Sequence, residues 1–315
     1  AGRRRVSWLP VGVPSPYGSG PLVSLCRSSK PFGLALQEAC AKTGRLCVGI
    51  DPHTALMQQW GLEWNVAGLR EFTQICVEAF AGRVALVKPQ VAFFECFGSQ
   101  GFAILEKALA DLHDAGTLVV ADAKRGDIGS TNKGYADAWL RDDSPLACDA
   151  LTVSPYLGVA SLAPLFTAAQ ESGKGLFVLA RTSNPEGAVI QNAVTSLDSD
   201  ERMENSETSS CSVAQYVVDY VSACNAIEKE RWGIGSYGVV VGATVQQPPL
   251  LENLCGPVLL PGVGAQGATK DDVDRIVGNK GTLGIPNISR ALLECGPSVE
   301  DLATQLSKFN SEYLA

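Results

Sequence analysis

The sequence has few histidines and no closely spaced cysteine pair, the features on which metal and redox sites usually depend. Only two histidines, His53 and His113, occur among 315 residues, and none of the ten cysteines forms a C-x-x-C pair. Protein sites for zinc and other transition metals are built mostly from these side chains. We therefore expect no metal site and no dithiol redox motif, a surface position for His113 and a structural role for His53.

Long apolar runs and an excess of basic residues are also absent. No run reaches the roughly 18 apolar residues that indicate a membrane-spanning helix, and the formal net charge of −8 disfavours non-specific binding to nucleic acid. A chain of this size without a recognisable signal peptide fits a secreted disulfide framework poorly. We expect a cytoplasmic protein with reduced, mostly buried thiols that binds neither nucleic acid nor membrane.

The first thirty residues differ in composition from the rest of the chain. They contain five basic residues, no acidic residue and many Pro, Gly and Ser. A targeting segment would also be rich in Arg and poor in acids, but so many prolines and glycines argue against an amphipathic helix; a gene-start artefact is an equal alternative. We expect 1–30 to be a disordered basic extension and 31–315 to form the catalytic domain.

Short apolar strands alternate regularly with helical patterns along that domain. Helical periodicity is clear, for example, over 68–82 and 101–116. Eight such alternations without a break predict a single-domain α/β fold, a (β/α)₈ TIM barrel, rather than an open sheet. The predicted strands are 46–51, 84–89, 117–124, 148–154, 175–181, 238–243, 257–262 and 282–289.

One interval, 182–210, is longer than a compact domain usually allows without structure of its own. Its second half, 195–210, is polar and acidic, which favours a surface insertion. Its beginning, TSNPEG at 182–187, directly follows a predicted strand and is a better candidate for a lid. We expect a long loop insertion, and either role remains possible on this basis.

A cluster of charges lies at the end of the third predicted strand. The segment VVADAKRGDIGST, 119–131, places four charged residues within six positions. Side chains alternate along a strand, so Asp122 and Lys124 are expected to point into the barrel mouth, with Val120 beneath them in the core. The two alanines between them are expected to face the surrounding helices.

Polar residues end other predicted strands at the same level. Asp51 ends the first strand, the second ends in Lys88, Ser154 ends the fourth, and the eighth leads into Arg290. Buried ion pairs barely offset their own desolvation, so a purely stabilising network is a weak explanation. Barrel enzymes bind their substrates at the C-terminal face of the strands, and this pattern predicts a polar ligand there.

A glycine-rich segment, PGVGAQG at 261–267, follows the seventh predicted strand. It fits the G-x-G-x-x-G pattern, but it comes too late in the chain for a dinucleotide fingerprint, and isolated matches are common. Loops after strands seven and eight of barrels commonly bind phosphate through backbone N–H groups. Gln266 and Arg290 are suitable side chains for the same anion.

Taken together, these motifs resemble the orotidine 5′-monophosphate decarboxylase family, in particular its bacterial-type branch. They occur in family order from about residue 31 to 315, and the D-x-K-R-x-D-I pattern is specific in this company. The matching segments are GIDPH (49–53), LVKPQVAFFE (86–95), ADAKRGDIGST (121–131), VSPYLG (153–158), TSNPEG (182–187), VGAT (241–244), PGVGAQG (261–267) and NISRALL (287–293).

The resemblance implies a cofactor-independent decarboxylation of orotidine 5′-monophosphate to UMP and CO₂, the last step of de novo UMP biosynthesis. Lys124 would stabilise and protonate the C6 carbanion, and Asp122 would repel the substrate carboxylate. Lys88 and Asp127 would complete the charged array, with Asp127, Ile128 and Thr131 reaching into the partner's site of a homodimer. The implied substrate-binding residues are Asp51 and Lys88 for ribose, Ser154 for the pyrimidine, Gln266 and Arg290 for phosphate, Pro261 for the pocket wall, and Ile128 and Thr131 from the partner.

Two alternatives remain open at this level. A metal-dependent barrel decarboxylase or aldolase acting on a sugar phosphate shares the D-x-K-x-x-D pattern, but it needs a carboxylate where this chain has Lys88. A catalytically silent binder of a phosphate ligand is the other. The complete Lys88, Asp122, Lys124 and Asp127 set argues against a binder, because such a protein could lose these charges and gain stability.

Overall fold

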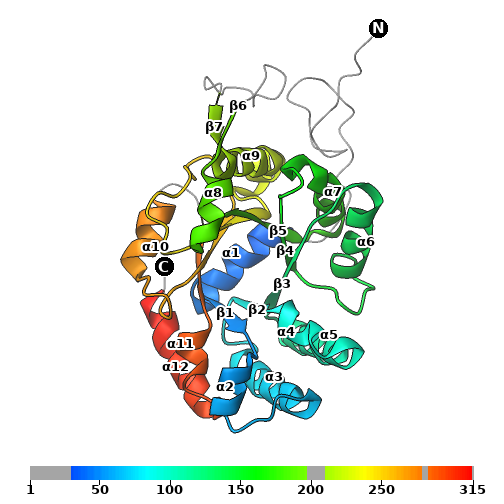
Figure 1. Ribbon diagram of the computed structural model, residues 1–315, viewed down its shortest axis with the longest axis vertical. Coiled ribbons are helices and arrows are strands. Elements are labelled where there is room, and N and C mark those ends of the chain that lie inside the picture. The colour runs from blue at the N-terminus through cyan, green and yellow to red at the C-terminus, as the bar shows by residue number, and fades with distance from the viewer. Residues whose placement is uncertain (1–29, 197–209, 279–282, 314–315) are drawn as a thin grey trace.

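The computed structural model describes residues 30–196, 210–278 and 283–313. Eight parallel strands close into a barrel with helices on its outside (Figure 1). The order around the barrel is β1-β10-β9-β8-β5-β4-β3-β2, so strands that are consecutive in this set are also neighbours in space. The predicted (β/α)₈ barrel is confirmed, whereas the predicted extension at 1–30 lies outside the described residues except for Lys30.

All eight predicted strands are present. Their interiors are buried almost continuously, as expected of parallel strands covered on both sides. The barrel strands are β1 (Cys47–Ile50), β2 (Leu86–Pro89), β3 (Leu118–Arg125), β4 (Ala150–Val153), β5 (Gly175–Arg181), β8 (Tyr237–Val241), β9 (Pro257–Pro261) and β10 (Leu283–Ile288).

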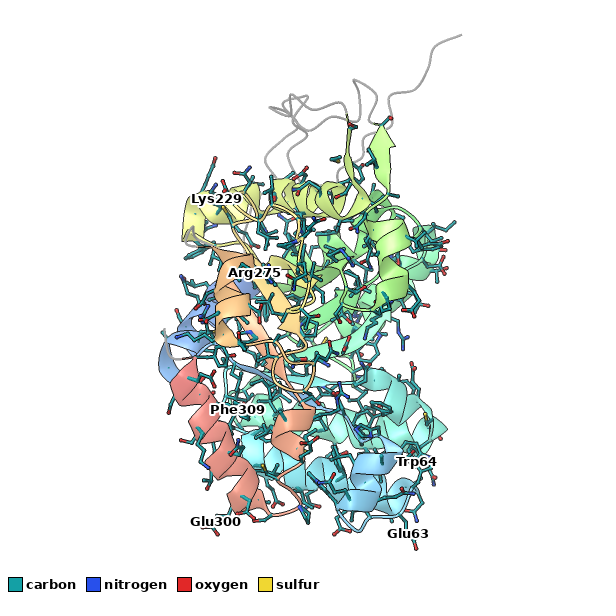
Figure 2. The ribbon with its side chains drawn as sticks, turned by 60° about the vertical axis from the view of Figure 1, so that its left-hand side comes forward. Glu63, Trp64, Lys229, Arg275, Glu300 and Phe309 are labelled. Carbon is teal, nitrogen blue, oxygen red and sulfur yellow. The ribbon has the colours of Figure 1, made fainter. Side chains whose placement is uncertain are left out.

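The helices connect successive strands and pack on the outside of the barrel. Charged side chains such as Glu63, Lys229 and Glu300 lie on the outer surface (Figure 2). The α-helices are α1 (Phe32–Thr43), α2 (Thr54–Gln59), α3 (Val66–Phe80), α4 (Val91–Glu95), α5 (Gly98–Asp114), α6 (Gly129–Trp139), α7 (Ala163–Ser172), α8 (Ala188–Gln191), α9 (Val213–Trp232), α10 (Lys270–Val277), α11 (Arg290–Leu293) and α12 (Val299–Glu312); two short 3₁₀ turns are η1 (Val159–Leu162) and η2 (Pro185–Gly187).

Helix α1 closes the N-terminal end of the barrel. Its Phe32, Leu36 and Cys40 belong to the same buried cluster as the side chains that fill the barrel interior, including Val120 and Phe177. The Phe32 and Phe177 rings meet edge to face with their centroids 6.1 Å apart. The barrel is therefore filled at one end and can accept a ligand only at the other.

A larger apolar cluster lies between the strands and the outer helices. Ala121 and Ala123 belong to it, while Val120 belongs to the barrel interior, as the alternation along this strand predicts. Small residues at these outward positions allow the helices to approach the sheet closely. Trp60 anchors the α2 end of this layer by stacking on Phe72, with centroids 4.3 Å apart.

The interval 182–210 is more structured than predicted. It contains η2, helix α8, and the beginning of an antiparallel two-stranded hairpin, β6 (Val194–Ser196) with β7 (Ser210–Ser212), that extends beyond α9 (Figure 1). Hence this part of the insertion is not a structureless loop, because backbone pairing satisfies its polar groups. The remainder of the predicted acidic stretch, 197–209, lies outside the described residues.

Several smaller predictions can also be compared with the structure. His113 is exposed on α5, and His53 has a structural role, since its Nδ1 accepts a hydrogen bond from the Leu56 amide at 3.3 Å and caps α2. All nine cysteines of the described ranges are free thiols. No helix in those ranges is both long and apolar enough to cross a membrane.

Candidate active site

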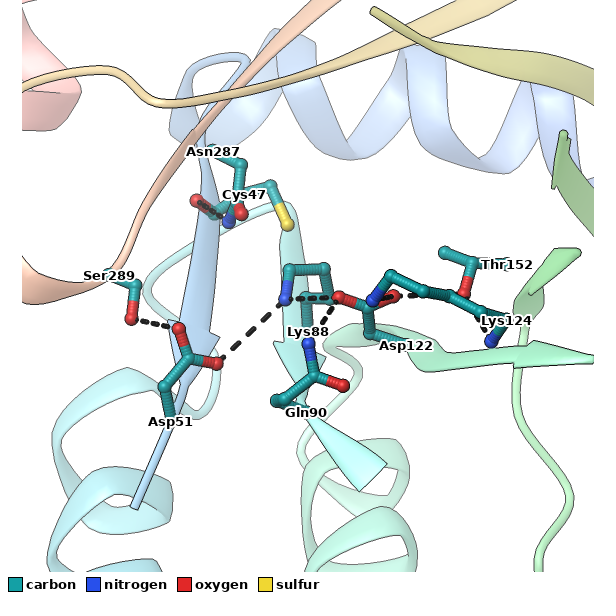
Figure 3. Close-up of polar contacts among 9 residues, drawn as sticks. All are labelled: Cys47, Asp51, Lys88, Gln90, Asp122, Lys124, Thr152, Asn287 and Ser289. Atoms are coloured by element: carbon teal, nitrogen blue, oxygen red, sulfur yellow. Dashed lines mark hydrogen bonds and ion pairs between the residues drawn. The ribbon is translucent and has the colours of Figure 1, made fainter. Parts of the chain in front are cut away.

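The carboxyl ends of β1, β2 and β3 bring three charged side chains together. These strands are adjacent, with Gly49 of β1 level with Lys88 of β2 and Gln90 bridged to Asp122 of β3. The Lys88 Nζ atom lies 2.9 Å from Asp122 Oδ2 and 3.8 Å from Asp51 Oδ1 (Figure 3). The lysine is only 5% exposed, so this charge sits inside the barrel mouth.

Asp122 is the centre of the polar network. Its Oδ2 accepts hydrogen bonds from Lys88 Nζ and from Gln90 Nε2, each at 2.9 Å. Its Oδ1 accepts from Lys124 Nζ at 2.7 Å and from the Thr152 hydroxyl at 2.9 Å. Four donors therefore surround a carboxylate that is 8% exposed, which is the environment that an ionised buried acid requires.

Opposing effects determine the protonation states of Asp122 and Lys88. Burial alone would raise the pKa of Asp122, but the nearby Lys88 and Lys124 ammonium groups outweigh it and hold that pKa below its ordinary value. Burial would likewise lower the pKa of Lys88, but Asp122 and Asp51 hold it above its ordinary value. Both groups are charged at neutral pH.

Asp51 has one carboxylate oxygen with an unused hydrogen-bonding capacity. Its Oδ2 accepts from the Ser289 hydroxyl, which belongs to the segment after β10. Its Oδ1 is buried and has no hydrogen-bond partner in the described residues, although the Lys88 ammonium lies 3.8 Å away. A buried acceptor of this kind suits a hydroxyl donor from a bound ligand.

Lys124 presents its ammonium at the edge of the network. Its side chain is about half exposed, while its Nζ reaches back to Asp122. Its backbone has φ of 48°, in the left-handed region that only glycine adopts readily. This conformation coincides with an irregularity in the pairing of β3 with β4, which skips from Ala121 to Arg125.

The glycine-rich loop after β9 forms the other side of the mouth. Gly262, Gly264 and Gly267 all have positive φ, which allows the tight turns of this loop. A Cβ atom added to Gly262 would lie 2.8 Å from Gln266 Oε1, so a larger residue would displace that side chain, and its φ of 106° would be strained. Gln266 Oε1 also accepts a hydrogen bond at 3.1 Å from Ser183, which connects this loop to the one after β5.

Helix α10 begins only at Lys270, capped by Thr269, and not directly at the end of this glycine-rich turn. This spacing differs from the dinucleotide fingerprint, in which the glycines open the helix itself. Arg290 faces the same side of the mouth, and no other described residue pairs with its guanidinium. The loop and the arginine together can bind an anion.

An open cavity of about 270 Å³ connects the charged network with the glycine-rich loop. Its size is close to the lower end of small-ligand pockets, roughly 300 Å³. Leu179, Val240 and Leu259, which belong to the apolar cluster of the barrel interior, line part of it. The lining residues are Asp51, Lys88, Gln90, Asp122, Lys124, Thr152, Leu179, Thr182, Val240, Leu259, Pro261, Gly262, Val263, Ala265, Gln266, Asn287, Ser289 and Arg290.

Four of the predicted site residues do not line this cavity. Asp127, Ile128 and Thr131 lie where β3 leads into α6, and Ile128 is 62% exposed. Ser154 lies just beyond the end of β4, where its amide donates to the Arg125 carbonyl. The strand-four side chain that does enter the cavity is Thr152, so the predicted contact of Ser154 with a ligand gains no support from the cavity geometry.

Sequence reasoning missed several polar residues of the site. Thr152 stands out as the one polar residue in the apolar run 150–153, and Gln90 directly follows Lys88 and Pro89. Asn287 lies near the end of β10, and Ser289 follows the strand two positions later, the spacing that strand alternation assigns to one face. These signals are present in the sequence, whereas the contact of Ser183 with Gln266 depends on how two separate loops fold.

The donor set does not favour a divalent metal at this position. Within the described ranges, no three His, Cys, Asp or Glu side chains come close enough to hold one. The place beside Asp122 that a metal would occupy is held by the Lys88 ammonium, whose charge repels a cation. The mouth instead combines two ammonium groups, two carboxylates and a glycine-rich loop that can bind an anion. It can therefore bind a phosphorylated anion and donate a proton to it.

Comparisons with known proteins agree on one family. Residues 44–304 match the family described as orotidine 5′-phosphate decarboxylase / HUMPS. An orotidine 5′-phosphate decarboxylase from Corynebacterium efficiens is 51% identical over 285 residues, covering 90% of this chain and 98% of the relative. The enzyme of that name from Streptomyces coelicolor is 49% identical over 284 residues, covering 90% and 97%.

Solved structures give the same result. The crystal structure of a Streptomyces avermitilis protein described as an orotidine 5′-phosphate decarboxylase has 48% sequence identity and a TM-score of 0.81, covering 91% of this chain and 96% of that one. The Leishmania donovani OMP decarboxylase structure has 29% identity and a TM-score of 0.64, covering 90% and 100%.

Proposed function

Since the chain belongs to the orotidine 5′-phosphate decarboxylase family, we propose that it decarboxylates orotidine 5′-monophosphate to UMP and CO₂, the last step of de novo UMP synthesis, and that Lys124, Asp122 and Lys88 perform this reaction. The main support is the hydrogen-bonded Lys88–Asp122–Lys124 network, which shares one cavity with the glycine-rich loop and Arg290. The substrate has a matching shape, with a carboxylated pyrimidine at one end and a phosphate at the other.

The chemistry requires charge stabilisation more than bond activation. Loss of CO₂ from C6 leaves a carbanion in the plane of the pyrimidine ring, which the ring cannot delocalise. The Lys124 ammonium stabilises this charge as it develops and then donates its proton to C6. The carboxylate of Asp122 lies beside the departing carboxylate, and the repulsion is relieved as CO₂ leaves.

Substrate binding is distributed around the mouth. We propose that Arg290, the Gln266 side chain and the loop backbone hold the 5′-phosphate, while Pro261 lines the pocket. The free Oδ1 atom of Asp51 accepts a hydrogen bond from a ribose hydroxyl, and Lys88 donates one. Phosphate binding far from C6 then supplies the remote binding energy that positions the reacting end.

We further propose a homodimer whose two sites each take residues from both chains. Asp127 does not line its own chain's cavity, and its side chain accepts a hydrogen bond from the neighbouring Ile128 amide. The large apolar side chains of Ile128, Tyr156 and Leu157 are exposed on the loops after the neighbouring strands β3 and β4. Burying these side chains against a second copy directs Asp127, Ile128 and Thr131 toward the partner's mouth.

The decarboxylase assignment is tested directly by incubating the purified chain with orotidine 5′-monophosphate and a metal chelator. Loss of substrate absorbance and release of CO₂ are expected at the same rate with and without the chelator. No turnover under any condition would refute the assignment. Turnover that the chelator abolishes would favour a metal-dependent barrel enzyme instead.

A Lys124→Ala variant separates an enzyme from a silent binder. The enzyme is expected to lose decarboxylation while keeping affinity for UMP, because the phosphate and ribose contacts remain. A wild-type chain that binds UMP and shows no turnover would instead support a binder.

Mixing two inactive variants tests the shared site. Lys124→Ala and Asp127→Ala chains are each expected to be inactive, but a mixed dimer contains one site with neither change. Random exchange of subunits should then restore about a quarter of the wild-type activity. No recovery after verified subunit exchange would refute the shared site.

We also propose that the protein works in the cytoplasm. Cys40, Cys47, Cys76, Cys148 and Cys224 are buried free thiols, and burial raises the pKa of Cys40 and of Cys148 to about 12. Such thiols suit a reducing compartment. Fractionation of the source cells, with the activity followed in each fraction, is the appropriate measurement.

A further inference from the structure

Arg125 follows the lysine to which the proposed function assigns the proton transfer, and its side chain points away from the cavity. It forms an ion pair with Glu95 at the end of α4. Its guanidinium also lies 5.8 Å from the ring centroids of both Tyr135 and Trp139 on α6. The arginine thus joins the end of β3 to the two helices that flank it, and none of these contacts involves the predicted ligand.

One further contact of Arg125 bears on the site. Its Nη1 donates a hydrogen bond at 3.2 Å to the carbonyl of Ala123. That carbonyl belongs to the peptide unit that joins Ala123 to Lys124. The amide at the other end of the same unit, Lys124 N–H, donates to the Thr152 hydroxyl at 2.9 Å. Side chains therefore hold both ends of this peptide unit.

This arrangement replaces ordinary sheet pairing. The register between β3 and β4 skips from Ala121 to Arg125, so the intervening residues have no regular partners on β4. The orientation of this peptide unit about the N–Cα bond is what sets φ at Lys124, and φ there is 48°. A lysine has no preference for that region, so the conformation persists only where the surroundings impose it.

The direction of the Lys124 side chain depends on this conformation. With negative φ, as in a regular strand, the Cα–Cβ bond would point elsewhere, and Nζ would leave its position 2.7 Å from Asp122 Oδ1. The Lys124 ammonium lies beside Asp122 (Figure 3). Its position is thus set by the backbone as well as by its own flexible side chain, which is about half exposed.

We propose that Arg125, held by Glu95 and the two aromatic rings, is a positioning residue that fixes the left-handed backbone of Lys124 and thereby places its ammonium for proton transfer. This inference rests on the proposed function for its kinetic consequences, but its structural part is independent of any activity. Arg125 makes no contact with the substrate in this scheme.

The central variant is Arg125→Gln, compared with Arg45→Gln as a matched control. Arg45 is similarly shielded and pairs with Asp274 at 2.8 Å, but it lies before β1, at the opposite end of the barrel. Displacing a reacting group by about 1 Å can cost about a hundredfold in rate. We expect kcat of Arg125→Gln to fall about ten- to a hundredfold, with the affinity for UMP within about twofold of wild type.

The control is expected to keep its kcat even if its melting temperature falls, because its ion pair is remote from the mouth. Glu95→Gln should show a weaker form of the Arg125→Gln effect. Arg125→Lys keeps the charge but lacks the planar fork that reaches both Glu95 and the Ala123 carbonyl, so it should not restore kcat. Full recovery in Arg125→Lys would overturn the proposal, and so would an Arg125→Gln kcat within about twofold of wild type.

A structural measurement keeps the test independent of catalysis. In a crystal structure of Arg125→Gln, φ of Lys124 should leave the left-handed region, or its Nζ should move away from Asp122. Amide hydrogen exchange at Lys124 should be faster than in wild type. An unchanged Lys124 backbone with unchanged exchange would overturn the inference, even if the chain proved to have no decarboxylase activity.

Discussion

Replacing Asp122 with asparagine should destabilise the fold strongly although the two side chains have the same shape. The carboxylate accepts from Lys88, Gln90, Lys124 and Thr152. An asparagine offers one acceptor oxygen and one NH₂ group. If its oxygen faces Lys124 and Thr152, its NH₂ group faces the two donors Lys88 and Gln90. The buried Lys88 ammonium then loses its closest counter-charge.

The expected loss can be worked from this geometry. Removing one partner of a buried ion pair costs about 3–5 kcal/mol. For a domain larger than 150 residues each kcal/mol lowers the melting temperature by about 2–4 °C, so a decrease of about 10 °C is expected. Calorimetry and urea unfolding measure both quantities. Asp111→Asn is the control, because its exposed i,i+4 pair with Lys107 contributes less than about 1 kcal/mol.

Activity provides a second measurement on the same variant. Loss of a preorganised charged group at the reacting centre costs about 10²–10³-fold in kcat. If Asp122→Asn were as stable as the wild type, the network could not be the mutually stabilising arrangement inferred from its distances. The two lysines would then have to be neutral or differently placed, and the assignment of charges in the mouth would be wrong.

Three further predictions concern the same region. Gly262→Ala should raise KM about tenfold or more, because its Cβ would contact Gln266 Oε1 and its φ of 106° disfavours a side chain. An unchanged KM would argue against a phosphate site in this loop. Asn132→Ala removes the fully buried amide that binds both the N–H and the C=O group of Asp127. The free energy of unfolding measured in urea should fall by about 1–3 kcal/mol. Light scattering should show weaker dimerisation. The fold lowers the pKa of Asp122, so its ionised form stabilises the protein above the unfolded pKa of about 4, and this stabilisation is lost as the pH falls further. The acid-induced decrease in melting temperature should therefore be smaller in Asp122→Asn than in the wild type. An equal decrease would contradict this.

The barrel and the centre of its site could be predicted from the sequence because both depend on local patterns. Parallel strands buried on both faces produce apolar runs of recognisable length, and alternation along β3 was enough to place Asp122 in the mouth. Lys124 also lines the mouth, but its direction there depends on a left-handed backbone that regular alternation does not predict. The predicted directions of Val120 and of Ala121 and Ala123 followed from the same rule and are confirmed.

The features that the sequence did not reveal depend on contacts between distant segments. The β6–β7 hairpin forms in a polar stretch without the apolar alternation that marks a half-buried strand. Ser154 follows the alternation of β4, but the strand ends at Val153, one residue too early. The role of Arg125 could not be predicted because its partners, Glu95 on α4 and Tyr135 on α6, come close to it only in the folded barrel.

The plug formed by α1 has a consequence for the order of events in catalysis. With Phe32, Leu36 and Cys40 filling one end of the barrel, substrate entry and the departure of both products share a single opening. A new substrate cannot enter while UMP remains. The loops after β5 and β9 are joined through Ser183 and Gln266 and border that opening. They therefore affect both substrate entry and product release. A substitution that strengthens the contact between these two loops should increase the affinity for UMP and slow its release. Affinity and turnover rate therefore cannot be improved independently at this contact.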